Sequence, residues 1–198
     1  SRGVHHRDLK PENVMIGDFG EVLVMDWGLS KETGFAGEAE EVLSAAPSSD
    51  GAEWRTMEGS VLGTPTYMSP EQARGEVDAV DARSDIYCLG AILHEILYLQ
   101  PPVDGGGALE IVEKVGRGEL DPPPKAVRPH WPGGRVPASL EAVRGKAMAF
   151  DPARRYPSVP DLQSDIVAYQ SGFATSAEAA SVATQAVLFF KRNRGVSI

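Results

Sequence analysis

The chain has 198 residues, 42% of them hydrophobic, which is enough to bury the core of one sizeable domain or two small ones. A formal net charge of -9 argues against a protein that coats nucleic acid, because phosphate neutralisation requires clustered lysines and arginines. The chain has no apolar run long enough to span a membrane, no secretory signal and a single cysteine, Cys88. We therefore expect a cytoplasmic protein in a reducing compartment.

The first 60 residues predict a β-hairpin followed by an acidic connection. Two short apolar runs, 14–16 and 22–25, flank the turn-rich segment 17–20, a pattern typical of a hairpin. Residues 32–60 carry seven acidic residues against one basic residue, Arg55, and show almost no periodic apolar pattern. This segment is either a disordered linker or a regulatory loop, and its composition fits both.

Helical periodicity begins after Pro70. Apolar residues at three- and four-residue spacing predict a buried helix over 84–99, with Ser84 as its N-cap and two prolines after its end. Weaker patterns of the same kind predict three shorter helices, at 107–116, 138–149 and 158–171.

Two segments in this half are not expected to join the helical core. The proline-rich connection 121–137 is incompatible with a helix or a central strand. The tail 176–198 contains an apolar run, 186–190, that basic residues follow. Either a terminal helix docks onto the domain here, or the segment approaches a membrane with its basic residues on the cytoplasmic side.

The residues 6–13, HRDLKPEN, carry the strongest chemical signal. They match the H-R-D-x-x-x-x-N catalytic loop of protein kinases. Phosphoryl transfer requires a carboxylate that orients the attacking hydroxyl, a cation on the transferred phosphate and oxygen ligands for Mg²⁺. Asp8, Lys10 and Asn13 supply one of each.

A second metal carboxylate is also required, and Asp18 and Asp26 compete for this role. If the hairpin turns at residues 18–19, the numbers of paired residues add up to about 38, so Asn13 faces roughly position 25 and lies beside Asp26. Asp18 then lies at the tip, roughly 16 Å from Asn13 at about 3.3 Å per residue. One Mg²⁺ with ligands at about 2.1 Å does not bridge that gap, which selects Asp26.

With these motifs, the chain resembles the C-terminal lobe of a eukaryotic-like (Hanks-type) bacterial serine/threonine protein kinase. The 18-residue interval between Asp8 and Asp26 agrees with that family, and Lys10 resembles the serine/threonine-specific form of its loop. The sequence GTPTYMSPE at 63–71 resembles the end of the family's activation segment, with Ser-Pro-Glu in place of Ala-Pro-Glu.

The resemblance covers about residues 3–172 and implies a mainly α fold with a short β-hairpin at the catalytic loop, the N-terminal β lobe being missing. The implied organisation is a kinase C-lobe at 1–172 and a tail at 173–198 that is a candidate juxtamembrane segment. The lobe comprises a catalytic loop at 4–13, an activation segment at 26–71 and a helical subdomain at 72–172.

Three further residues are implied as structural support. The family pairs a glutamate and an arginine that match Glu71 and Arg155, and a buried pair of this kind is costly to break from one side, by about 3 to 5 kcal/mol. The alternative is two unrelated surface charges of little value. Asp85 matches the aspartate that ties down the catalytic-loop backbone, or it is only a favourable acid in the first turn of a helix.

Regulation by phosphorylation is a second implication. Arg7 resembles the arginine that pairs with a phosphorylated residue of the activation segment in many family members. We hypothesise that phosphorylation of Thr56, Ser60 or another hydroxyl in 44–60 orders this loop by creating a charge that Arg7 can pair with. The alternative is a mobile loop that is not phosphorylated.

The implied function is transfer of the ATP γ-phosphate to serine or threonine hydroxyls of proteins, with ATP and Mg²⁺ as cofactors. In this reading Asp8 acts as the catalytic base and Lys10 contacts the γ-phosphate. The Thr64 hydroxyl bonds to Asp8 and Lys10. Asn13 and Asp26 hold Mg²⁺.

The family's Gly-rich loop, strand lysine and helix glutamate are missing from the chain, which begins with serine just before the catalytic loop, as expected of a fragment. We therefore expect weak ATP binding and little or no transfer by this polypeptide alone. Protein substrates and ATP are the expected partners, with membrane attachment beyond the C-terminus as a further possibility. The alternative function is a non-catalytic kinase-like interaction module.

Overall fold

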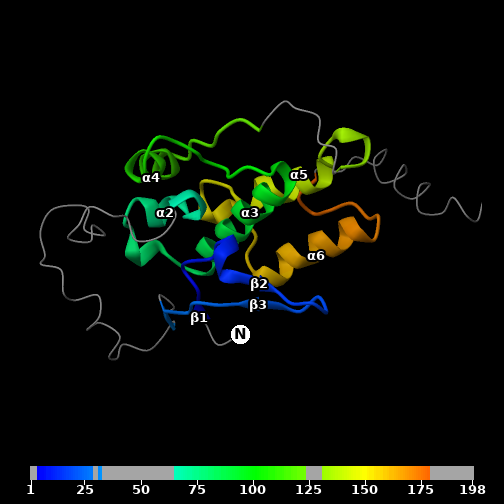
Figure 1. Ribbon diagram of the computed structural model, residues 1–198, viewed down its shortest axis with the longest axis horizontal. Helices are drawn as coiled ribbons and strands as arrows, with labels where there is room; N and C mark the ends of the chain where they lie inside the picture. The colour runs from blue at the N-terminus through cyan, green and yellow to red at the C-terminus, as the bar shows by residue number, and fades with distance from the viewer. Residues whose placement is uncertain (1–3, 29–30, 33–64, 124–130, 179–198) are drawn as a thin grey trace, which may run out of the picture.

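The computed structural model describes residues 4–28, 31–32, 65–123 and 131–178. Within these ranges the fold is mainly helical, and the helices gather around α3, the longest of them (Figure 1). Its α-helices are α2 (Pro70–Ala73), α3 (Ala82–Tyr98), α4 (Ala108–Arg117), α5 (Ala138–Ala147) and α6 (Val159–Gln170). Its strands are β1 (Val4–His5), β2 (Val14–Ile16), β3 (Val22–Val24) and β4 (Lys31–Glu32).

The strands form two small antiparallel pairs, β1 with β4 and β2 with β3. The β2–β3 hairpin pairs Val14 with Val24 and Ile16 with Val22, which confirms the register predicted from the turn. Its apolar side chains are largely exposed, including Ile16 at 74% and Val22 at 61%. The hairpin therefore adds little to the buried core.

The four predicted helices are all present, and their ends lie within two residues of the predicted ones. One detail was wrong: the N-cap of α3 is Asp81, not Ser84. The Asp81 side chain accepts a hydrogen bond from the Arg83 amide, and the Asp81 amide donates to the Ser84 hydroxyl. The apolar pattern did not reveal this cap because the first turn of α3 is mostly polar.

The short helix α2 was not predicted. Ser69 caps it by a reciprocal exchange with Gln72, and Pro70 occupies its first turn. The S-x-x-Q spacing, with a proline directly after the serine, is a recognised signal for a helix start and was available in the sequence.

The core lies where α3 packs on α5 and on the segment before α6. Ile86, Val143 and Tyr156 are fully buried there. Gly90 makes the close approach possible, because a Cβ at this position would lie 2.7 Å from Met148 Cγ and 2.8 Å from Ala147 Cβ. In the described part of residues 121–137, the proline-rich connection forms one 3-10 turn, Pro132–Gly134, and otherwise irregular chain.

The expected acidic connection, 32–60, lies outside the described residues apart from Glu32. Of the expected tail at 173–198, only residues 173–178 are described, and these pack on the domain: Ser176 and Ala177 donate backbone hydrogen bonds to Asp165. None of the helices in the described ranges is both long enough and apolar enough to cross a bilayer.

Candidate active site

The Asp8 carboxylate lies at the centre of the candidate site, in the loop between β1 and β2. Its Oδ2 atom lies 2.9 Å from Lys10 Nζ and accepts a hydrogen bond of 3.1 Å from Asn13 Nδ2. The Asp8 side chain is 21% exposed, and its other oxygen has no partner among the described residues. One carboxylate oxygen is thus fixed and the other remains free to accept a hydrogen bond from a hydroxyl group.

The Met25 amide donates a hydrogen bond of 2.9 Å to the Asn13 carbonyl, so Asp26 is the next residue along the chain from the one that pairs with Asn13. The Asn13 Nδ2 donates to both the carbonyl and the carboxylate of Asp8, and the side-chain oxygen of Asn13, an acceptor, receives no hydrogen bond from the described residues. The exposed Asp26 carboxylate forms no ion pair or hydrogen bond with the described part of the chain. An amide oxygen and a free carboxylate suit the hard-oxygen preference of Mg²⁺.

The competing aspartate, Asp18, lies in the turn at the far end of the hairpin. Gly17 closes this turn by a backbone bond of 2.8 Å to the Glu21 carbonyl, and Gly20 adopts φ +85°. Strand β2 separates Asp18 from Asn13. The turn geometry explains why two glycines flank Asp18 without any role in metal binding.

Asp85 connects the first turn of α3 to the catalytic loop. Its two carboxylate oxygens accept hydrogen bonds of 2.8 Å from the backbone amides of His6 and Arg7. Arg7 adopts φ +69°, a left-handed conformation that is unfavourable for a residue with a side chain. The two bonds from a buried carboxylate hold the loop in that conformation immediately before Asp8.

Glu71 and Arg155 form a fully buried ion pair, with side chains 1% and 0% exposed. The Arg155 Nη atoms donate to the two carboxylate oxygens of Glu71 at 2.7 and 2.9 Å. The other Arg155 N–H groups donate to the carbonyls of Ala149, Arg83 and Phe150. Every donor of the guanidinium is therefore paired, which is the condition under which a buried charge is tolerated.

The electrostatics of Glu71 reflect this pairing. Burial alone would raise the pKa of Glu71, but hydrogen bonds from Arg155 and Ser84 outweigh it and leave the pKa below its ordinary value. The Ser84 hydroxyl donates at 2.6 Å from the first turn of α3. Helix α2 is in this way attached to the same helix, α3, that holds the backbone of His6 and Arg7.

Two contacting residues, His6 and Gln72, were not singled out from the sequence. Gln72 Nε2 donates a hydrogen bond of 2.6 Å to the Arg7 carbonyl, so α2 also holds the catalytic loop. The Asp8 amide donates to His6 Nδ1, and His6 Nε2 lies 2.9 Å from the Met25 carbonyl. The histidine of the HRD motif could have been found by its place in that motif, whereas no sequence spacing points to the contact between Gln72 and Arg7.

Thr64, Thr56 and Ser60 lie outside the described residues. Arg7 belongs to the described part, and its Nε atom is buried without a hydrogen-bond partner there.

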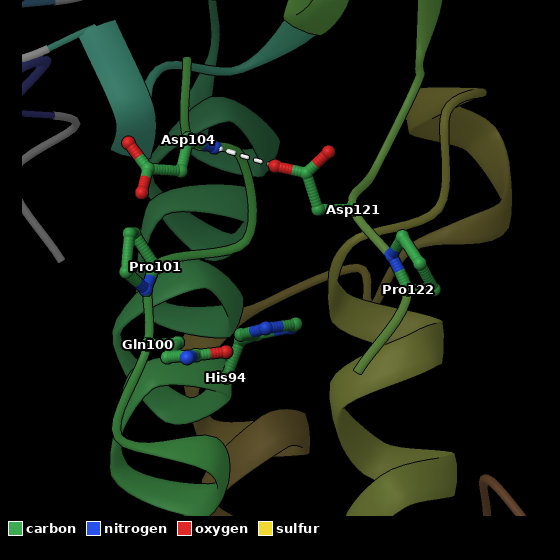
Figure 2. A pocket seen from close by; sticks show the side chains of 6 residues that line it. All are labelled: His94, Gln100, Pro101, Asp104, Asp121 and Pro122. Carbon is green, nitrogen blue, oxygen red and sulfur yellow. Dashed lines mark hydrogen bonds between the residues drawn. The ribbon is translucent and has the colours of Figure 1, made fainter. Parts of the chain in front are cut away.

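A small cavity of about 120 Å³ lies away from the site, beside the C-terminal part of α3 (Figure 2). None of the catalytic-loop residues lines it. Its lining residues are His94, Gln100, Pro101, Asp104, Asp121 and Pro122. A hydrogen bond of 2.6 Å from the Asp104 amide to the Asp121 carboxylate closes one side of the cavity.

Comparison with known proteins identifies the family of the chain. Residues 1–156 match the protein kinase domain family. The chain is 40% identical over 172 residues to the serine/threonine-protein kinase PknD of Protochlamydia amoebophila. It is 37% identical over 170 residues to the probable serine/threonine-protein kinase PknB of Bifidobacterium longum, and 36% identical over 170 residues to PknB of Mycobacterium tuberculosis.

These matches cover 87%, 86% and 86% of the chain. The chain spans only 17%, 21% and 24% of the lengths of the same three proteins.

Proposed function

Because the chain belongs to the protein kinase family, we propose that it forms the C-terminal lobe of a bacterial serine/threonine protein kinase, which transfers the γ-phosphate of ATP to protein hydroxyl groups. The lobe comprises residues 1–172, with the catalytic loop at 4–13, the activation segment at 26–71 and the helical subdomain at 72–172. The observation that carries the proposal is the Asp8–Lys10–Asn13 cluster beside Asp26.

In this mechanism the free oxygen of Asp8 accepts the hydrogen bond of the attacking serine or threonine hydroxyl and takes up its proton as the base. Lys10 lies against the other Asp8 oxygen and places a positive charge beside the transferred phosphate. The family resemblance supports a further proposal, that the Thr64 hydroxyl bonds to Asp8 and Lys10. Asn13 and Asp26 would hold Mg²⁺, and the cation would supply positive charge next to the phosphate groups.

Phosphorylation of the activation segment, at Thr56, Ser60 or a nearby hydroxyl, would add a charge for Arg7 to pair with. The buried Nε of Arg7, which has no partner in the described ranges, supports this proposal. Phosphopeptide mass spectrometry of active protein provides the test. We expect phosphate within 44–60, and its absence there from fully active protein would contradict the proposal.

The proposed partners are ATP and the proteins that carry the acceptor hydroxyls, and the proposed location is the cytoplasm or the cytoplasmic face of a membrane to which residues beyond 172 lead.

The exposed apolar hairpin suits a contact with the N-terminal β lobe of a complete kinase domain. Ile16, Val22 and Leu23 offer this surface.

The test uses the longest polypeptide that the gene encodes, with radiolabelled ATP and a generic protein acceptor. Asp26→Asn should reduce transfer by at least about a hundredfold, because it removes a charged metal ligand. The matched control, Asp18→Asn, removes the same charge from the hairpin tip and should leave the rate unchanged. Wild-type protein that binds partners but transfers no phosphate would favour the non-catalytic interaction module.

A further inference from the structure

Asp26 has a backbone conformation that the chain must hold in place. Its φ of +59° lies in the left-handed region, where only Arg7, Asp26 and Leu99 are found among the described non-glycine residues. An aspartate tolerates this region better than most residues, but at a penalty in free energy. The direction in which the carboxylate points depends on what restrains the residues on each side of it.

The restraint on the preceding side is the backbone of Met25. Its amide donates a hydrogen bond to the Asn13 carbonyl at 2.9 Å, and its carbonyl lies 2.9 Å from His6 Nε2. The His6 Nδ1 atom accepts from the Asp8 amide, which leaves the proton on Nε2 and makes this nitrogen the donor to Met25. Both polar groups of Met25 are therefore occupied.

The restraint on the following side is the side chain of Trp27. Its indole Nε1 donates a hydrogen bond of 3.0 Å to the carbonyl of Val24, the last residue of β3. The ring also contacts the His6 ring, with centroids 4.8 Å apart and a tilt of 56°. Because Trp27 is 51% exposed, burial alone does not fix its position.

We infer that Trp27 is a positioning residue for the metal site: its indole N–H closes a bracket from Val24 across Asp26 and holds the Asp26 carboxylate beside Asn13. This inference rests on the proposed function, in which Asp26 and Asn13 share a cation. A phenylalanine at position 27 keeps an aromatic ring against His6 but has no donor for the Val24 carbonyl. The hydrogen bond is therefore the part of the bracket that depends on tryptophan.

The variant Trp27→Phe isolates that hydrogen bond. We expect the Mg²⁺ concentration that gives half-maximal phosphate transfer to rise about two- to tenfold, as for the loss of one net hydrogen bond. The KM for the protein acceptor should not change, since the acceptor does not touch Trp27. The measurement uses the longest polypeptide that the gene encodes.

Trp131→Phe is the matched control. Trp131 makes the same kind of bond, from its indole Nε1 to the Leu97 carbonyl at 3.1 Å, at a distance from the metal ligands. Its loss should leave the Mg²⁺ requirement unchanged. An equal rise in both variants would reveal general destabilisation and would overturn the inference.

A second measurement does not depend on activity. In the 198-residue chain labelled with ¹⁵N-tryptophan, the indole signal that Trp27→Phe removes should exchange with water several-fold more slowly than free tryptophan. Exchange as fast as in free tryptophan would contradict the bracket, whether or not any variant folds poorly.

The proposed function is tested separately in the same assays by Asp26→Asn. If Asp26→Asn raises the Mg²⁺ requirement and Trp27→Phe does not, only the inference about Trp27 fails. If Asp26→Asn has no effect, the assignment of the metal ligand fails, and with it the proposed function of the site.

Discussion

The two sides of the catalytic loop differ in how their charges are treated. On the helical side, Glu71 and Arg155 are buried and all their polar atoms are paired, and the Asp85 carboxylate is occupied by two backbone amides. On the hairpin side, Asp26 is exposed and unpaired within the described residues, and one oxygen of Asp8 is free.

This difference distinguishes carboxylates that support the loop from carboxylates that are free to bind a cation. A carboxylate already neutralised by an arginine has little left to offer a cation, whereas an exposed and unpaired one can bind it without first breaking an ion pair. In the proposed function, the helical side therefore fixes the loop, and the hairpin side presents the metal ligands. Substitutions on the first side should change stability, and those on the second side should change metal binding.

Arg155→Ala should give the largest effect, a loss of about 3 to 5 kcal/mol in the free energy of unfolding, because it leaves Glu71 buried and unpaired. Urea denaturation of the 198-residue chain measures this change. Arg154→Ala, the control, removes an exposed arginine from the neighbouring position and should change stability by less than about 0.5 kcal/mol. Equal losses in the two variants would contradict the proposed role of the buried pair.

Gly90→Ala should have the next largest effect. The added methyl group would press on Met148 and Ala147, so we expect a loss of about 1 to 3 kcal/mol. Gly145→Ala in α5 meets no atom within 4 Å and should instead stabilise the helix by up to about 1 kcal/mol. Thermal unfolding monitored by circular dichroism compares the two, and a stabilised Gly90→Ala variant would show that α3 and α5 are not in close contact.

The pH dependence of the free energy of unfolding should show the lowered pKa of Glu71 as a smaller effect. Because its folded-state pKa lies below the ordinary value of 4.5, its pairing contributes stability above that pH and loses this contribution as the pH falls through the folded-state pKa. The stability difference between wild type and Glu71→Gln should therefore narrow as the pH falls below 4.5. A difference that stays constant from neutral pH down to acid unfolding would contradict the lowered pKa.

Val22→Thr should give the smallest effect, because this hairpin side chain is 61% exposed. We expect a change within about 0.5 kcal/mol in the free energy of unfolding of this chain. The same substitution at the fully buried Val143 places a hydroxyl in the core and should destabilise by about 1 to 3 kcal/mol. Similar losses at both positions would show that the hairpin belongs to the core after all.

The hairpin register and the four longer helices could be predicted because local signals determine them. The turn at residues 18–19 fixed which residues pair, and this placed Met25, the residue before Asp26, opposite Asn13, with Asp18 at the far end of the hairpin. Apolar spacing located α3 but not its cap, because the polar first turn of α3 interrupts the pattern that the prediction followed.

The supporting contacts were beyond reach of residue spacing alone. Gln72 and Arg7 are 65 positions apart, and Glu71 and Arg155 are 84 apart. Family resemblance suggested the second pair but gave no sign of the first. The five N–H donors of Arg155 bind groups in α2, at the start of α3 and directly after α5. Only tertiary packing brings these groups together.

The most direct test of the metal site is paramagnetic relaxation by Mn²⁺ in the ¹⁵N-labelled 198-residue chain, which requires neither ATP nor turnover. Mn²⁺ is a hard cation that accepts the same oxygen ligands as Mg²⁺. The structure predicts early broadening of the amide signals of Asn13, Met25 and Asp26, lost in Asp26→Asn and retained in Asp18→Asn. Broadening that spares these three residues, or that persists unchanged in Asp26→Asn, would contradict the account.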